Sequence, residues 1–120
     1  MKIRIKGASV RLRLTQTDVS EFDSSGICTE ATPLIGGTFH YHLKRGQAYA
    51  ATLGGGSITV EIPAEEARAW AQSDQVGLSS KLTLPHGEEV ALLIEKDFAC
   101  LAPDRDEDES DMFPNPNSHC

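Results

Sequence analysis

One pattern occurs twice in this chain of 120 residues, and it constrains the fold more than any other feature of the sequence. The segments SVRLRL (9–14) and SITVEI (57–62) both alternate apolar and polar residues, which is typical of strands with one buried face. A helical segment and a glycine follow each of them, and aligning the two segments brings Phe22 onto Trp70. The pattern therefore predicts an internal duplication of a ββαββ unit, with halves at residues 1–47 and 48–96.

The first half is expected to begin with a β-hairpin. Residues 2–6 alternate basic and apolar side chains, Gly7 and Ala8 supply a tight turn, and the strand 9–14 follows. Because side chains on a strand point alternately to its two faces, Arg11 and Arg13 should share the outward face. A short helix capped by Thr15 or Thr17 should then run through Phe22, followed by strands near 27–32 and 38–44.

The second half should repeat this order. A strand over 49–53 leads through a glycine turn into 57–62, a helix is expected over 64–74, and two strands near 81–84 and 89–95 end the unit. The helices carry apolar stripes that need a sheet to cover, and Trp70 is predicted to be a core anchor. Because the links between strands are short, we expect a single α+β domain with a mostly antiparallel sheet, either barrel-like or two-layered.

Charge separates the chain into a body, residues 1–102, and an acidic, proline-containing tail, residues 103–120. The chain has a net charge of −7 and a pI near 4.9, which argues against nucleic acid and anionic membranes as main partners. Apolar residues on both sides of the acidic run, Phe98 before it and Met112 and Phe113 after it, predict an ordered tail packed on the body. Arg11 and Arg13 are candidate partners for its carboxylates.

The cellular location is expected to be the cytoplasm. No apolar run approaches the roughly 20 residues of a membrane span, and the first residues do not resemble a signal peptide. Three cysteines, an odd number, fit reduced thiols better than a disulfide framework. Cys28, in an apolar stretch, is predicted to be a small, buried hydrophobic residue.

Familiar catalytic motifs are absent from the sequence, and two groups of residues remain as candidates for chemistry. His40 and His42 share one face of a strand, where two imidazoles could ligate a metal or could lie on a solvated surface. Cys100, His119 and Cys120 offer three ligands of the kind that zinc prefers. The alternative is a core Cys100 and an untethered terminal pair.

Four segments are similar to those of a known family: RLRLTQTDV (11–19), AWAQSDQVG (69–77), LIEKDFACL (93–101) and EDESDMFPNP (107–116). They resemble DUF7009, a family of small bacterial proteins of unknown function. The resemblance implies that the tail belongs to the domain. It implies no activity, cofactor or catalytic residue.

Three functions follow as hypotheses. The first is a non-catalytic binding or interaction protein that meets a protein partner or a second copy through a β surface or the tail, without a cofactor. The second is a small zinc protein that uses Cys100 with His119 and Cys120. The third is an enzyme whose acid–base site combines His40 and His42 with carboxylates, with Arg11 and Arg13 as further surface candidates.

Overall fold

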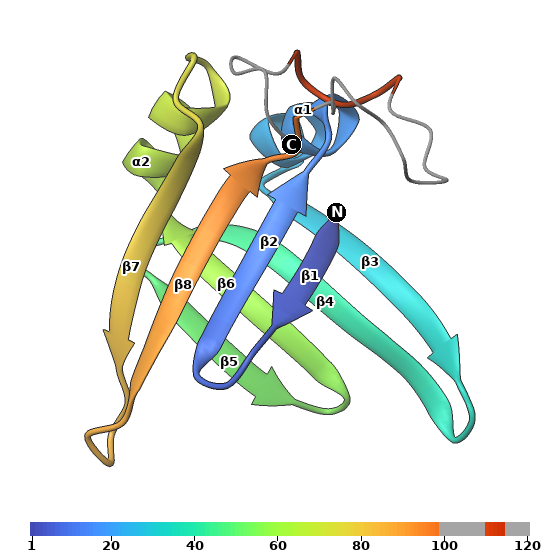
Figure 1. The fold of residues 1–120 in the computed structure, drawn as a ribbon, viewed down its shortest axis with the longest axis vertical. Coiled ribbons are helices and arrows are strands. Elements are labelled where there is room, and N and C mark those ends of the chain that lie inside the picture. Colours follow the sequence, from blue (N-terminus) through green and yellow to red (C-terminus); the bar gives the residue numbers. More distant parts are fainter. Residues whose placement is uncertain (99–109, 115–120) are drawn as a thin grey trace.

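The computed structural model describes residues 1–98 and 110–114. Within these ranges the chain forms eight strands and two helices, arranged as two facing four-stranded sheets with both helices at one end (Figure 1). Neither of the described helices is long and apolar enough to cross a membrane. The elements in chain order are β1 (Lys2–Ile5), β2 (Ser9–Leu14), α1 (Gln16–Ser25), β3 (Ile27–Leu34), β4 (Gly37–Gly46), β5 (Ala50–Gly54), β6 (Ser57–Pro63), α2 (Ala64–Ala71), β7 (Gly77–Thr83) and β8 (Glu89–Lys96).

Each sheet combines a hairpin from the first half with a hairpin from the second. The strand orders are β1-β2-β8-β7 and β3-β4-β6-β5. Within each hairpin the strands are antiparallel, as the short links predict, whereas the central pairs β2·β8 and β4·β6 are parallel. The sequence predicted a mostly antiparallel sheet, whereas the structure contains two mixed sheets. The barrel-like alternative is wrong because the two sheets are not closed into one, and the two-layered alternative describes the fold.

The strand registers repeat between the halves. Ser9 pairs with Ala91 in the β2·β8 ladder, and Ser57, the counterpart of Ser9, pairs with His40 in the β6·β4 ladder. The outer hairpins agree, since Lys2 pairs with Arg13 and their counterparts Ala50 and Glu61 pair with each other. Both halves therefore place matching sequence positions at corresponding points of the two sheets.

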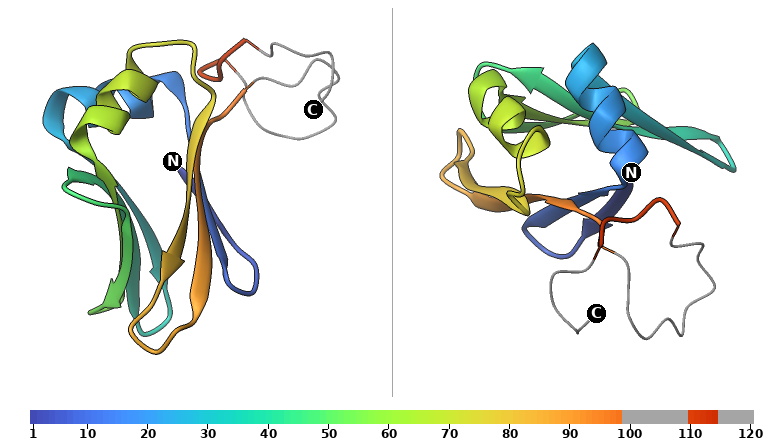
Figure 2. Two further views of the ribbon diagram at one scale, coloured as in Figure 1. Left: turned by 90° about the vertical axis from the view of Figure 1, so that its left-hand side faces the viewer. Right: turned by 90° about the horizontal axis from the view of Figure 1, so that it is seen from above.

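The core lies between the sheets, and the two helices cover its upper end (Figure 2). Phe22 of α1 and Trp70 of α2 are fully buried, and their rings meet edge to face with centroids 6.3 Å apart. The Trp70 indole N–H donates to the carbonyl of Val76 at 3.1 Å. Trp70 is therefore the core anchor that the sequence predicts.

Cys28 is buried beside Asp18, as its apolar neighbours predict. Burial raises the pKa of its thiol to about 12, and the charge of Asp18 adds to the rise. Because the thiolate is the reactive form, this cysteine is a poor nucleophile.

The helix ends differ from the sequence prediction for local reasons. Thr15 caps α1, and Asp18 completes a capping box with it. The helix continues past Phe22 to Ser25, because Gly26 ends it in a left-handed conformation and donates to the Phe22 carbonyl. Helix α2 ends at Ala71, before the expected residue 74. Just after this end, the Ser73 hydroxyl donates a hydrogen bond to the Ala69 carbonyl at 2.6 Å.

A short C-terminal segment supplies a further cap for α1. The backbone N–H of Gln16 donates to the Asp111 carbonyl at 3.0 Å, and the Thr17 N–H and hydroxyl donate to the Asp111 carboxylate at 3.3 and 3.0 Å. Phe113 donates its N–H to the carbonyl of Asp97 at 2.9 Å, and Met112 is buried. The rest of the predicted tail lies outside the described residues, so its packing stays a prediction.

Candidate functional site

Basic side chains gather on the outer face of the first sheet. We call this surface the basic face, defined by Lys2, Arg4, Lys6, Arg11 and Arg13. These residues alternate with the apolar residues that pack inward, Ile3 on β1 and Leu12 and Leu14 on β2. The basic face is therefore set directly by the alternating sequence and by the register of the β1–β2 hairpin.

Like charges lie directly opposite each other on this face. The hairpin register pairs Arg4 with Arg11 and Lys2 with Arg13. Directly opposed like charges in an antiparallel pair are destabilising. The fold therefore carries an unfavourable arrangement here, in a chain that is acidic as a whole.

Two carboxylates relieve part of this repulsion. Glu95 of β8 forms an ion pair with Arg11 and lies 3.8 Å from the Arg13 guanidinium. Asp97, which is 3% exposed, lies 3.1 Å from the Lys2 ammonium. Arg11, Arg13 and Lys2 are thus tied to the body. Pairing of Arg11 and Arg13 with the acidic run of the tail stays a prediction, because residues 99–109 lie outside the described ranges.

Arg4 and Lys6 remain open to ligands. Both are exposed, and neither has an ion-pair partner within the described ranges 1–98 and 110–114. Together with Ser9, Arg11 and Leu93 they line a shallow depression in the sheet surface. The depression presents these exposed cations and a hydroxyl beside an apolar floor.

The corresponding face of the other sheet is not basic. When the two hairpins are superposed by register, Thr52 takes the position of Arg4 and Thr59 that of Arg11, and these threonines also face each other. Ala50 and Glu61 correspond to Lys2 and Arg13. At these register positions the second sheet thus carries neutral or acidic residues.

The two histidines lie on the opposite side of the molecule. His40 and His42 project from the outer face of the second sheet, with stacked rings 6.2 Å apart, and His42 Nδ1 lies 2.8 Å from the Thr29 hydroxyl. Lys44 continues the same face of β4. Arg11 and Arg13 belong to the other sheet, so the structure does not bring the four predicted surface residues together.

Cys100, His119 and Cys120 lie outside the described residues, and the zinc hypothesis stays a prediction. Within residues 1–98 and 110–114 no three His, Cys, Asp or Glu side chains are close enough to hold a metal ion.

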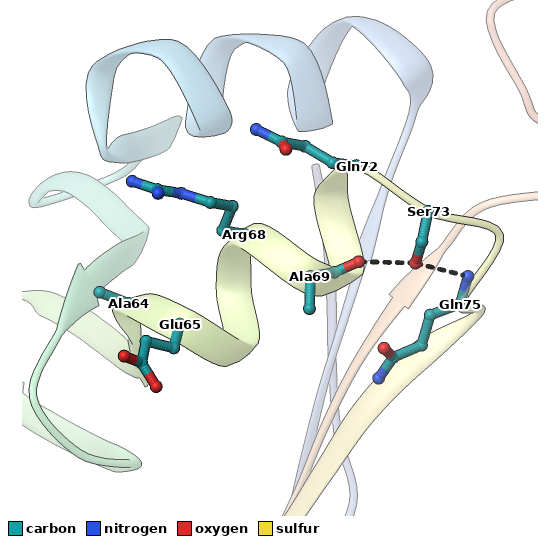
Figure 3. Close-up of a pocket in the computed structure, with 7 residues that line it drawn as sticks. All are labelled: Ala64, Glu65, Arg68, Ala69, Gln72, Ser73 and Gln75. Carbon is teal, nitrogen blue, oxygen red and sulfur yellow. Dashed lines mark hydrogen bonds between the residues drawn. The ribbon is translucent and has the colours of Figure 1, made fainter.

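A second depression is lined by residues of α2 and of the loop that follows it, from Ala64 to Gln75 (Figure 3). Three of its lining residues are joined by local hydrogen bonds, in which the Ser73 hydroxyl donates to the Ala69 carbonyl and accepts from the Gln75 N–H at 3.2 Å. Its ionisable lining residues are Glu65 and Arg68. This surface carries one acidic and one basic side chain. Among its lining residues, no nucleophilic side chain contacts a general base.

A buried cation lies at the end of β8. Lys96 is 6% exposed, donates to the Ser73 carbonyl at 2.6 Å, and lies over the rings of Trp70 and Phe113. Burial lowers the pKa of its ammonium group, and the charge of Asp74 opposes this. Its contacts join β8, the loop after α2 and the 110–114 segment, which is a structural role.

Sequence reasoning identified Arg11 and Arg13 but did not single out Arg4 and Lys6. The signal was present in the hairpin, because a tight turn at Gly7-Ala8 places 2, 4 and 6 on the same face as 11 and 13.

Comparisons with known proteins identify a family and no individual relative. No curated protein and no solved structure matches this chain. The model of DUF7009, described as a family of unknown function, matches residues 1–117, nearly the whole length. On this match, the chain belongs to the DUF7009 family.

Proposed function

We propose that this protein is a non-catalytic binding protein whose basic face holds an acidic segment of a polypeptide partner. The observation that carries the proposal is the opposition of Arg4 and Arg11 across the β1–β2 ladder, beside the exposed Lys6. An anionic ligand placed over these cations would remove the repulsion between them. Binding would thus be strengthened by an unfavourable feature of the unbound protein.

The contrast between the two sheets supports a functional origin for the cations. Where the first sheet has Arg4 and Arg11, the second has Thr52 and Thr59 at corresponding positions. Arg4 and Arg11 repel each other, and binding of an anionic ligand accounts for a pair of opposed cations on this sheet alone.

A polypeptide is favoured over nucleic acid by the overall charge. The whole chain carries −7, and a nucleic-acid duplex with its continuous phosphates would meet repulsion beyond the edge of the basic face. A short acidic segment can approach this face alone. Its attraction should be strongest at low salt, because surface charges are screened as ionic strength rises.

The experiment is calorimetric titration of the full chain with short poly-L-glutamate, and separately with duplex DNA, at low and high salt. We expect poly-L-glutamate to bind at low salt and DNA to bind more weakly or not at all. Arg4→Glu should weaken poly-L-glutamate binding by about tenfold, since it replaces an attraction with a repulsion.

The matched control is Thr52→Glu, which adds a negative charge at the corresponding position of the other sheet. It should leave the affinity nearly unchanged. Arg4→Glu changes the net charge by −2 and Thr52→Glu by −1, so a pure net-charge effect would cost Thr52→Glu half as much binding free energy as Arg4→Glu. A Thr52→Glu loss of that size or larger would mean that only net charge matters, and the proposal would fail. Tighter binding of DNA than of poly-L-glutamate would replace the polypeptide partner with a nucleic acid.

The internal duplication belongs to the same set of proposals. It is supported by the matching registers of the two sheets and by one pair of contacts in particular. The Met1 amine pairs with Asp18 at 2.7 Å, and at the corresponding positions of the second half the Tyr49 hydroxyl donates to Glu66 at 3.0 Å. A duplicated ancestor with two equivalent faces, of which one became basic, accounts for the pattern. A cytoplasmic location, in keeping with the cysteine content, also remains a proposal.

A further inference from the structure

Strand β1 lies at the end of its sheet, and its backbone geometry can be derived from the hairpin register. The N–H of Lys6 donates to the Ser9 carbonyl at 3.1 Å, which makes these two residues a hydrogen-bonded pair. Such pairs alternate with non-bonded pairs along an antiparallel ladder. The pair Arg4 and Arg11 is therefore bonded, and Ile3 and Ile5 turn their N–H and C=O groups away from β2.

The described part of the chain places no strand beside these outward groups. Strand β1 ends its sheet in the order β1-β2-β8-β7 (Figure 1), and no backbone partner of Ile3 or Ile5 occurs among residues 1–98 and 110–114. The Ile5 side chain, on the inner side of the strand, is 54% exposed. An exposed edge with unpaired backbone groups is a template for another strand.

The two faces of strand β1 differ in the side chains that they present at this edge. Outward, Arg4 and Lys6 offer cations; inward, Ile3 and Ile5 offer apolar surface. A strand that pairs here would present alternate side chains to these faces.

The corresponding edge of the second sheet allows the effect of the charged side chains to be separated from that of the unpaired backbone groups. Strand β5 has the same hairpin register and an exposed Leu53 in place of Ile5, at 77% exposure. Its outward residues are Ala50, Thr52 and Gly54, which are uncharged. The chain thus contains one edge with charge and one without.

We propose that the acidic partner binds by adding an antiparallel β-strand to the edge of β1. This inference rests on the proposed function and names its partner class: an extended segment in which acidic residues alternate with apolar ones. The partner's main chain pairs with Ile3 and Ile5, its carboxylates lie beside Arg4 and Lys6, and its apolar side chains cover Ile5. Main-chain hydrogen bonds then contribute affinity, and the alternating side chains contribute specificity.

The probe is the capped peptide EVEVEV, titrated against the full chain. Two peptides serve as controls: KVKVKV, and EVEVEV methylated on the valine nitrogens. Methylation keeps the charge but removes the N–H groups that would donate to β1. We expect it to weaken binding by roughly thirtyfold, since two or more hydrogen bonds are lost, and KVKVKV should not bind detectably.

Amide hydrogen exchange gives a second readout. With EVEVEV bound, exchange at Ile3 and Ile5 should slow, while exchange at Ala51 and Leu53 on the β5 edge should stay unchanged. Protection on both edges, or on neither, would overturn the proposal.

The outcomes separate this inference from the proposed function. If the methylated peptide binds as tightly as EVEVEV, while Arg4→Glu still weakens both, strand addition is overturned and charge recognition stands. If Thr52→Glu, with half the charge change, costs half as much EVEVEV binding free energy as Arg4→Glu or more, both proposals fail. A methylation effect together with an Arg4→Glu effect supports both.

Discussion

Replacing Asp111 with alanine should destabilise the protein although this residue lies near the end of the sequence. The carboxylate accepts the N–H and the hydroxyl of Thr17, in the first turn of α1. Losing a capping side chain costs about 1 kcal/mol, and losing a negative charge at a helix N-terminus costs about 0.3–1 kcal/mol. Because the Thr17 contacts are exposed, we expect a total of about 1–1.5 kcal/mol. The melting temperature should fall by about 4 °C for a domain of this size.

Urea unfolding of the full chain measures this effect. Asp111→Asn keeps an acceptor oxygen but not the charge, so it should lose about half as much. Glu88→Ala, on an exposed turn, controls for the loss of an acidic residue. Thr17→Ala and the double variant complete a mutant cycle, in which the two losses should not add. An Asp111→Ala effect no larger than that of Glu88→Ala would refute the capping role.

Three further predictions concern charge and packing. Arg4→Thr, which copies Thr52, should raise the free energy of unfolding by about 0.2–1 kcal/mol at low salt, and the gain should shrink as salt is added; a loss of stability would contradict the repulsion between Arg4 and Arg11. Burial alone would raise the pKa of Asp18, but hydrogen bonds from the Met1 amine and Thr15 outweigh it and hold the pKa below its ordinary value. The stabilisation from Asp18 should therefore be present above the pKa that Asp18 has in the unfolded chain, and it should be lost as pH falls through the lower pKa of the folded state. In urea unfolding, wild type should accordingly lose more stability than Asp18→Asn between about pH 5 and about pH 3. Trp70→Ala should cost about 3–5 kcal/mol in the same measurement, because it removes a fully buried ring and its hydrogen bond to Val76; a cost under about 1 kcal/mol would show that the core does not depend on it.

Local structure was predictable because its causes are local. The turn at Gly7-Ala8, a threonine cap at 15 or 17 and the alternation in 9–14 each depend on a few adjacent residues. The structure confirms the turn and the alternation, and it places the cap at Thr15. The apolar stripes of the two helices predicted that Phe22 and Trp70 face the core, where their rings meet. The parallel pairs β2·β8 and β4·β6 could not be read in this way, since nothing near Ser9 in the sequence identifies Ala91 as its neighbour.

Sequence reasoning predicted only the part of the candidate site that depends on local sequence. Arg11 and Arg13 follow from alternation on one strand, but their neutralisation by Glu95 depends on the parallel pairing with β8. Asp111 looked like one acid of a charged run, and its position at the α1 N-terminus follows from contacts between segments far apart in the sequence. Such long-range contacts depend on the packed whole and not on any local pattern.

The exchange of hairpins between the two sheets affects how the chain can fold. Strand β2 cannot meet β8 until residues 89–96 have left the ribosome, so the first sheet can be completed only after every other strand has been synthesised. Until then, the β1–β2 hairpin exposes an unpaired edge on each side, and closing so long a loop slows folding relative to proteins with local contacts. The second sheet has a much shorter closure, from β4 to β6, and is expected to form first during translation and serve as the surface on which the first sheet assembles.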